Sequence, residues 1–342
     1  MSDDKTEATQ EAEETTPIAA QSFFDCDGRE SWLDAVEALP GGYVPERGKP
    51  LPAPARASDV LLPARSFIIT PDTELSSMFL IEGERGCHRE CTFCVMRRST
   101  NGGMRLVRPD SILDLIPEHA TKVGLVGAAI SDHPQLVELL EAIHTSGRSV
   151  SVSSLRADRL ARRPRIAEIM RASGARSLTT ASDAATETLR KTLRKGATEA
   201  LLETVAAQAG SLGFQRLKIY MMLGVPGEED EDMDELIACT NHLARHLPIA
   251  LGVAPFVSKR MTPLDKLPFA GISVIERRVK RLQKGLDRRR AEVRPTSARW
   301  AWVEYQLAQG DAEVGEAAAK AILAGGRFAH YRKALAEIGK KV

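Results

Sequence analysis

The sequence predicts an α/β fold in which parallel strands alternate with helices. Six short apolar segments have the length of buried strands: residues 78–82, 122–126, 149–153, 177–180, 216–222 and 249–254. Amphipathic helical patterns separate several of them, at residues 134–146, 165–172, 198–210 and 229–246. Strands that alternate with helices pair in parallel through right-handed crossovers. Both a doubly wound sheet and a barrel fit this alternation.

A cluster of cysteines directly follows the first expected strand. The stretch reads Gly86-Cys87-His88-Arg89-Glu90-Cys91-Thr92-Phe93-Cys94, so three of the five cysteines lie in a C-x3-C-x2-C pattern. Three thiolates on a short loop can hold one cubane iron–sulfur cluster and leave its fourth iron without a protein ligand. The loop also lies where barrels carry their chemistry, at the C-terminal end of a strand.

Two other interpretations of the cysteines fit less well. A structural zinc site needs four ligands, and the candidate fourth ligand, His88, adjoins Cys87, which makes a tetrahedral arrangement awkward. A disulfide framework would need paired cysteines, whereas three clustered thiols suit a reducing compartment. The pattern therefore favours an iron–sulfur site.

The cysteine spacing, with Phe93 just before the third cysteine, resembles the signature of the radical S-adenosylmethionine (SAM) superfamily. The resemblance extends over residues 66–263 and includes the segments 69–74, 124–134, 153–158 and 218–228. It is strongest to the catalytic domain of a subfamily often fused to a cobalamin-binding domain. The resemblance implies a partial (β/α)6 TIM-type barrel, which the position of the cysteine loop also favours.

The same resemblance implies cofactors and a reaction. The cofactors would be one 4Fe-4S cluster and S-adenosylmethionine, and a flavodoxin or ferredoxin-type protein would supply the electron. Reductive cleavage of SAM would give a 5′-deoxyadenosyl radical that abstracts hydrogen from a substrate C–H bond. The substrate is not specified.

Site residues follow from the resemblance, position by position. Cys87, Cys91 and Cys94 would ligate iron. The residues expected around SAM are Phe93, Gly127, Ala128, Ser153, Ser154, Arg156, Asp183, Tyr220 and Met222. For Ser153, Tyr220 and Met222, packing inside the barrel is an equally good interpretation, since side chains normally fill barrel interiors.

The sequence departs from the subfamily in two places. Where relatives often have Pro-Glu followed by a glycine, this chain has Ala181-Ser182-Asp183-Ala184-Ala185. Residues 1–65 are too short for a cobalamin-binding domain and lack its D-x-H-x-x-G motif. Two alternatives therefore stay open: a methyltransferase that takes cobalamin from a separate corrinoid protein, and a non-catalytic iron–sulfur module.

Four regions are expected along the chain. Residues 1–20 are an acidic tail expected to be disordered, and residues 21–65 a proline-rich connector with a short helix at 29–39. The barrel spans 66–272, and a helical region of 273–342 follows, with a basic helix at 273–294 and further helices at 296–308, 311–323 and 328–340. A solvated face is the favoured interpretation of the basic helix, and contact with RNA or another polyanion is the alternative.

The amino-acid composition indicates the class of protein and its cellular compartment. A net charge of +1 with 43% hydrophobic and 27% charged residues is typical of a soluble globular protein. No apolar run has the length of a membrane span, and no secretory signal is visible, so we expect a cytoplasmic protein without membrane contact. Cys26 and Cys239 lie far from the cluster of cysteines and from each other, so one iron–sulfur cluster is expected.

Overall fold

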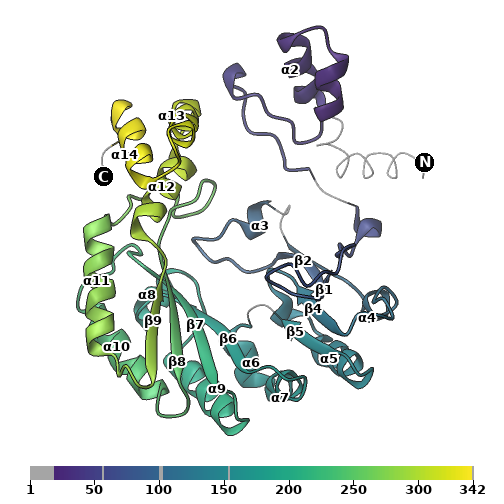
Figure 1. The fold of residues 1–342 in the computed structure, drawn as a ribbon, viewed down its shortest axis with the longest axis vertical. Coiled ribbons are helices and arrows are strands. Elements are labelled where there is room, and N and C mark those ends of the chain that lie inside the picture. The colour runs from purple at the N-terminus through teal and green to yellow at the C-terminus, as the bar shows by residue number, and fades with distance from the viewer. Residues whose placement is uncertain (1–18, 56–57, 100–102, 153–154, 341–342) are drawn as a thin grey trace.

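The computed structural model describes residues 19–55, 58–99, 103–152 and 155–340. Seven parallel strands form two neighbouring sheets (Figure 1). The first sheet has the order β1-β4-β5, with β1 (Phe79–Glu82), β4 (Lys122–Val126) and β5 (Ser149–Val152). The second has the order β6-β7-β8-β9, with β6 (Ser177–Asp183), β7 (Arg216–Leu223), β8 (Ile249–Pro255) and β9 (Ala291–Pro295).

The two sheets are joined edge to edge by backbone contact. The Leu155 N–H, just after β5, donates to the Thr179 carbonyl of β6 at 3.0 Å. Within the described residues, the outer strands β1 and β9 do not pair with each other, so the parallel arrangement stays open. The expected partial α/β barrel is therefore confirmed.

Helices pack on the outer side of the sheets. They are α4 (Pro109–Leu113), α5 (Leu136–Thr145), α6 (Ala157–Arg162), α7 (Pro164–Ala172), α8 (Glu187–Thr192), α9 (Glu199–Ser211), α10 (Asp232–Leu243) and α11 (Ile272–Gly285). Strand β7 shows how the layers form. Leu217, Ile219 and Met221 are buried in the core shared with the helices, whereas Lys218 and Tyr220 keep more exposure on the opposite, inner face.

The cysteine loop begins on a hairpin that the sequence did not predict. Strand β2 (Glu84–Cys87) follows β1 after one residue and pairs antiparallel with β3 (Gly103–Leu106). The short helix α3 (Met96–Ser99) lies between them in the chain. Cys87 is the last residue of β2, so its position is fixed by the hairpin ladder and not by the loop alone.

The prediction of a basic helix over residues 273–294 is wrong in its C-terminal part. Helix α11 ends at Gly285, Leu286 is extended, and residues 291–295 form β9, which pairs with β8. Apolar Ala291 and Val293 alternate there with Glu292 and Arg294, a period of two that suits a strand at a sheet edge. The sheets therefore contain one parallel strand more than predicted, and the residues that form it belong to the barrel.

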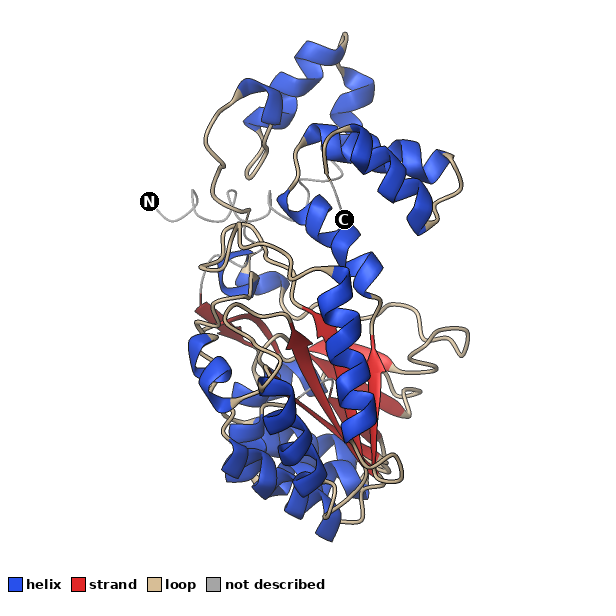
Figure 2. Cartoon of the chain, turned by 90° about the vertical axis from the view of Figure 1, so that its left-hand side faces the viewer, coloured by secondary structure: helices blue, strands red, loops and turns tan. Residues whose placement is uncertain are grey.

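Three helices after the barrel form a separate small core. They are α12 (Ala298–Gln309), α13 (Ala312–Leu323) and α14 (Phe328–Glu337), close to the predicted ranges. Trp302, Val314 and Leu335 are buried among them, and Phe269 and Ile272 connect this core to that of the barrel. Figure 2 shows these helices stacked beyond one end of the strands.

The N-terminal segment contains little regular structure before β1. It includes helical residues 19–25, then α2 (Arg29–Ala38), as predicted, and two single turns, η1 (Pro45–Arg47) and η2 (Asp59–Leu61). Residues 1–18 of the expected acidic tail lie outside the described residues. Within the described part of the chain, no helix is both long and apolar enough to cross a membrane.

Candidate functional site

The three cysteines of the motif line a single cavity of about 320 Å³, which we call the cysteine cavity. Cys87 ends β2, while Cys91 and Cys94 lie in the loop before α3, and all three are free, half-buried thiols. Five other predicted site residues line the same cavity: Phe93, Ala128, Arg156, Asp183 and Tyr220. Positions more than 130 residues apart in sequence therefore meet here.

The remaining predicted residues lie elsewhere. Gly127 lies next to the wall of the cavity, and Met222 lines a neighbouring cavity. Ser153 and Ser154 lie outside the described residues.

The thiols fit a cluster better than a single ion. Nowhere in the described residues do three His, Cys, Asp or Glu side chains meet closely enough to hold one metal ion. A cubane makes no such demand, because each thiolate binds a different iron at its own corner. Burial raises the pKa of the Cys87 and Cys91 thiols above its usual value. Iron binding would therefore have to displace their protons.

A buried aspartate holds the cysteine loop against two other elements. Asp132 lies after β4 and its side chain is fully buried. Arg89 of the cysteine loop donates to its two oxygens from Nε (2.8 Å) and Nη2 (2.6 Å), and Arg159 of α6 donates from Nε at 2.5 Å. Burial alone would raise the pKa of Asp132, but these hydrogen bonds outweigh it and lower the pKa to about 2. The loop is therefore tied to β4 and α6 by charge.

A second buried carboxylate lies behind the turn after β4. The Ala129 N–H donates to Oε1 of Glu84, a residue of β2, at 2.5 Å, and burial raises the pKa of Glu84 to about 7. A Cβ on Gly127 would collide with this carboxyl group. The glycine lets the turn lie flat on Glu84, so that Ala128 and Ala129 face the cysteine cavity.

Asp183 and Arg156 reach the cavity from the ends of strands. Asp183 closes β6 at a register shift, with φ of +65°, and forms an ion pair with Lys195. Arg156 precedes α6, its Nε donates to Asp158 at 2.9 Å, and its backbone N–H donates to the Ser131 hydroxyl at 3.3 Å.

The sequence analysis missed several residues of this site. Lys195, Ser131 and Arg89 line the cavity, and Glu84 and Asp132 support it from behind. Arg89 lies inside the cysteine motif, which was a signal for it. Lys195 follows α8 in a stretch without a motif, and only the tertiary structure brings it to Asp183.

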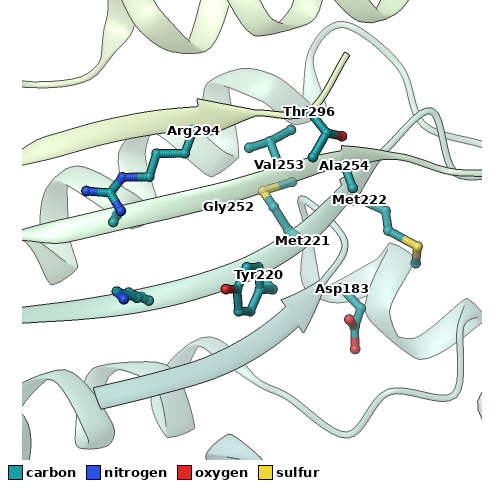
Figure 3. Close-up of a pocket in the computed structure, with 11 residues that line it drawn as sticks. Asp183, Tyr220, Met221, Met222, Gly252, Val253, Ala254, Arg294 and Thr296 are labelled. Atoms are coloured by element: carbon teal, nitrogen blue, oxygen red, sulfur yellow. The ribbon is translucent and has the colours of Figure 1, made fainter. Parts of the chain in front are cut away.

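A second cavity of about 420 Å³ lies on the inner face of β7, β8 and β9; we call it the β7–β9 trough (Figure 3). Its lining includes Lys218, Tyr220, Met222, Gly252, Ala254, Arg294 and Thr296. Asp183 and Tyr220 border both cavities. Tyr220 is 51% exposed, so it is not a core-packing residue, whereas Met222 packs partly against the core.

Three arginines of α11 form ion pairs with acids of the preceding segment. Arg281 forms an ion pair with Asp234 at 2.6 Å, and Arg277 and Arg278 pair with Asp230 at 3.1 and 3.0 Å. This pairing supports the interpretation of a solvated structural face.

The comparison with family models identifies one superfamily. Residues 81–239 match the family model of the radical SAM superfamily. An uncharacterized protein of Methanocaldococcus jannaschii is 30% identical over 239 residues, which cover 68% of this chain and 52% of that protein. The chain thus spans about half the length of this curated relative.

Parts of several solved structures also resemble the chain. SuiB of Streptococcus suis bound to S-adenosylmethionine is 14% identical, with a TM-score of 0.46, over 64% of this chain and 49% of that one. Methylornithine synthase is 18% identical, with a TM-score of 0.40, over 68% of each chain. The three cysteines of the motif lie near the start of the matched segment, after the first barrel strand. Residues 81–239 of this chain are a radical SAM domain, the domain of a superfamily of enzymes.

Proposed function

We propose that this protein is a radical SAM enzyme whose cluster and SAM bind together in the cysteine cavity. The observation that carries the proposal is the convergence of Cys87, Cys91 and Cys94 with Arg156 and Asp183 on one cavity. The thiolates would hold a 4Fe-4S cluster and leave one iron open. Bound there and reduced, the cluster and SAM would supply a 5′-deoxyadenosyl radical to a substrate C–H bond.

The chain's own residues would bind and orient SAM. The guanidinium of Arg156, which donates to Asp158 at the cavity wall, would pair with a carboxylate or ribose oxygen. Asp183 would accept hydrogen bonds from an amine or hydroxyl, and it already forms an ion pair with Lys195 beside the cavity. Phe93 and the turn at Gly127 and Ala128 would supply the apolar and backbone surface around the ligand.

The stretch at Asp183 bears on the non-catalytic alternative. Although Ala181-Ser182-Asp183-Ala184-Ala185 departs from the pattern of relatives, its carboxylate still lines the cavity. A decayed SAM site would not need to keep this acid and its lysine partner. We therefore place catalysis ahead of a purely structural cluster.

We further propose a cytoplasmic setting and a flavodoxin or ferredoxin-type electron donor. Three free, half-buried thiols on one loop need a reducing compartment to stay available for iron. Reductive cleavage of SAM would consume one electron per turnover, which such a donor protein would supply.

The test is SAM cleavage by anaerobically reconstituted full-length protein. With dithionite and SAM, we expect slow formation of 5′-deoxyadenosine and methionine, measured by chromatography against a sample without reductant. Asp183→Ala should weaken SAM binding and leave the iron content unchanged. Asp234→Ala, which removes an aspartate from an exposed ion pair on α10, is the matched control and should behave as wild type.

Two outcomes would redirect the proposal. If fully loaded protein binds SAM but forms no 5′-deoxyadenosine with several reductants, the non-catalytic alternative takes first place. If S-adenosylhomocysteine forms only when cobalamin is added, the protein is a methyltransferase that uses a separate corrinoid protein.

A further inference from the structure

The β7–β9 trough is built by a row of small residues on its central strand. Ala250, Gly252 and Ala254 alternate along β8 and face the trough. The strand on one side carries long side chains in the same rows, because Lys218 pairs with Ala250 and Tyr220 with Gly252. On the other side Arg294 pairs with Gly252. A strand with small side chains between two strands with long side chains leaves a groove.

Gly252 sets the position of the tyrosine that separates the two cavities. A Cβ on Gly252 would lie 2.5 Å from the Tyr220 ring, so the ring lies across the glycine. Figure 3 shows Tyr220 and Arg294 on strands that flank Gly252. Because Tyr220 also borders the cysteine cavity, a molecule held in the trough would touch the same ring as a molecule held beside the cysteines.

The charges on this inner face do not balance. Arg216 and Arg294 both pair with Glu292, at 3.2 and 2.6 Å. Lys218 has no ion pair with any residue that the structure describes, although it is half-buried in the trough wall. Asp183 does not supply the missing charge, because it is paired with Lys195. These strands therefore carry three cations and one carboxylate, Glu292, which pairs with Arg216 and Arg294 only.

Surplus positive charge in a concave, mostly apolar wall attracts a negative ligand. Low-dielectric walls strengthen the field of Lys218 and Arg294 inside the trough. An anion that binds beside these side chains would form charge-assisted hydrogen bonds with them. The volume of about 420 Å³ is that of a small-molecule site.

We propose that the trough binds the substrate of the radical reaction through an anionic group, a carboxylate or a phosphate, held by Lys218 and Arg294. This inference rests on the proposed function, because it makes the trough the substrate site beside the SAM site. Tyr220 would lie along the bound molecule, and the end of the substrate nearest Asp183 would be the end presented for hydrogen abstraction. Lys218, Arg294 and Gly252 would thus determine specificity.

The experiment follows anion binding at Tyr220 by ¹⁹F NMR. Full-length protein labelled with 3-fluorotyrosine has only four signals, because the chain has four tyrosines, and Tyr220→Phe identifies the one of interest. Inorganic phosphate and succinate are titrated separately at constant pH and ionic strength, which distinguishes phosphate from carboxylate recognition. Succinamide, which is neutral, is the control ligand. Spectra are recorded before and after cluster reconstitution.

We expect at least one anion to shift the Tyr220 signal saturably, while the other three tyrosines stay unchanged. Lys218→Met and Arg294→Met should each weaken that binding roughly tenfold, the loss of one charge-assisted contact. Lys218→Arg, which keeps the charge, should retain most of the affinity for the anion. This variant shows that a change at position 218 does not by itself unfold the protein. Lys320→Met, on the exposed face of α13, is the matched control and should leave the binding constant unchanged.

The inference is overturned if neither anion moves the Tyr220 signal, or if both methionine variants bind the anion as tightly as wild type does. An equal response to succinamide would also overturn it, since charge would then not matter. Formation of 5′-deoxyadenosine is measured on the same preparations. If no 5′-deoxyadenosine forms while anion binding is intact, the proposed function is rejected and the trough remains an anion site.

Discussion

The cysteine cavity and the β7–β9 trough share Tyr220 and Asp183 but are built in opposite ways. The cysteine cavity is made by turns and strand ends, and its charges are paired with one another, as in the contacts of Asp132 with Arg89 and Arg159. The trough is made by the regular rows of three strands, and Lys218 in its wall is left without a partner among the described residues. Ion pairs that are already formed within the protein suit a site that must hold a fixed cofactor. A charge without a partner suits a site that receives a ligand.

The largest expected effect is on the cysteine cavity. Replacing Cys87, Cys91 and Cys94 together by Ala should abolish cluster assembly, from about four irons per chain to none, because no other thiols line the cavity. Iron and sulfide analysis after anaerobic reconstitution measures this. The double variant Cys26→Ala, Cys239→Ala is the control and should load fully. Full iron content in the triple variant would place the cluster elsewhere.

The ion-pair network of the cysteine loop should be the next most sensitive point. Asp132→Asn leaves Arg89 and Arg159 without their shared buried carboxylate, so we expect a loss of roughly 3 kcal/mol in the free energy of unfolding. The reconstituted iron content should fall as well, since Arg89 lies between two cysteines of the motif.

Denaturation by urea measures the free energy of unfolding. The same substitution at Asp234, in an exposed pair with Arg281, should cost less than about 1 kcal/mol. Equal losses for the two variants would mean that Asp132 has no special role in the loop.

Glu84 should make the unfolding free energy depend on pH. Burial raises its pKa from 4.5 to about 7, so the folded state holds the proton more tightly than the unfolded state. Stability from this group is therefore greatest at low pH and falls as the pH rises from about 4.5 to about 7. The total change is at most about 3 kcal/mol. Glu84→Gln keeps an oxygen for the Ala129 N–H and should remove this dependence.

Urea denaturation of the cluster-free chain at pH 5.5 and pH 8 measures the difference. An unchanged pH dependence in Glu84→Gln would show that Glu84 is ionised throughout the range.

The smallest expected effect is in the trough. Gly252→Ala forces the Tyr220 ring away from β8, at a cost of roughly 1 kcal/mol, because the ring is a mobile side chain and not backbone. The ¹⁹F signal of Tyr220 should shift while the iron content stays at the wild-type value. Gly315→Ala on α13, where a Cβ meets open space, is the control. Loss of iron in Gly252→Ala would show that the two cavities do not act independently.

The same contrast explains what the sequence could predict. The cysteine loop was recognisable because its residues are adjacent in sequence, and period-two and 3.6-residue patterns placed most strands and helices. Lys195 could not be predicted, since its meeting with Asp183 depends on how α8 follows β6. Strand β9 was mistaken for helix because Arg288, Arg289 and Arg290 continue the basic character of α11 without a break in composition. The trough depends on register across three strands, which no local pattern encodes.

The most direct test of the account is the EPR spectrum of the reduced cluster with and without SAM. Three thiolates on the loop leave one iron free, so SAM should bind that iron and change the g values of the reduced cluster. We predict a changed spectrum in wild type and a weaker apparent affinity for SAM in Asp183→Ala. A fully loaded, fully reduced cluster whose spectrum is the same with and without SAM would contradict the central claim.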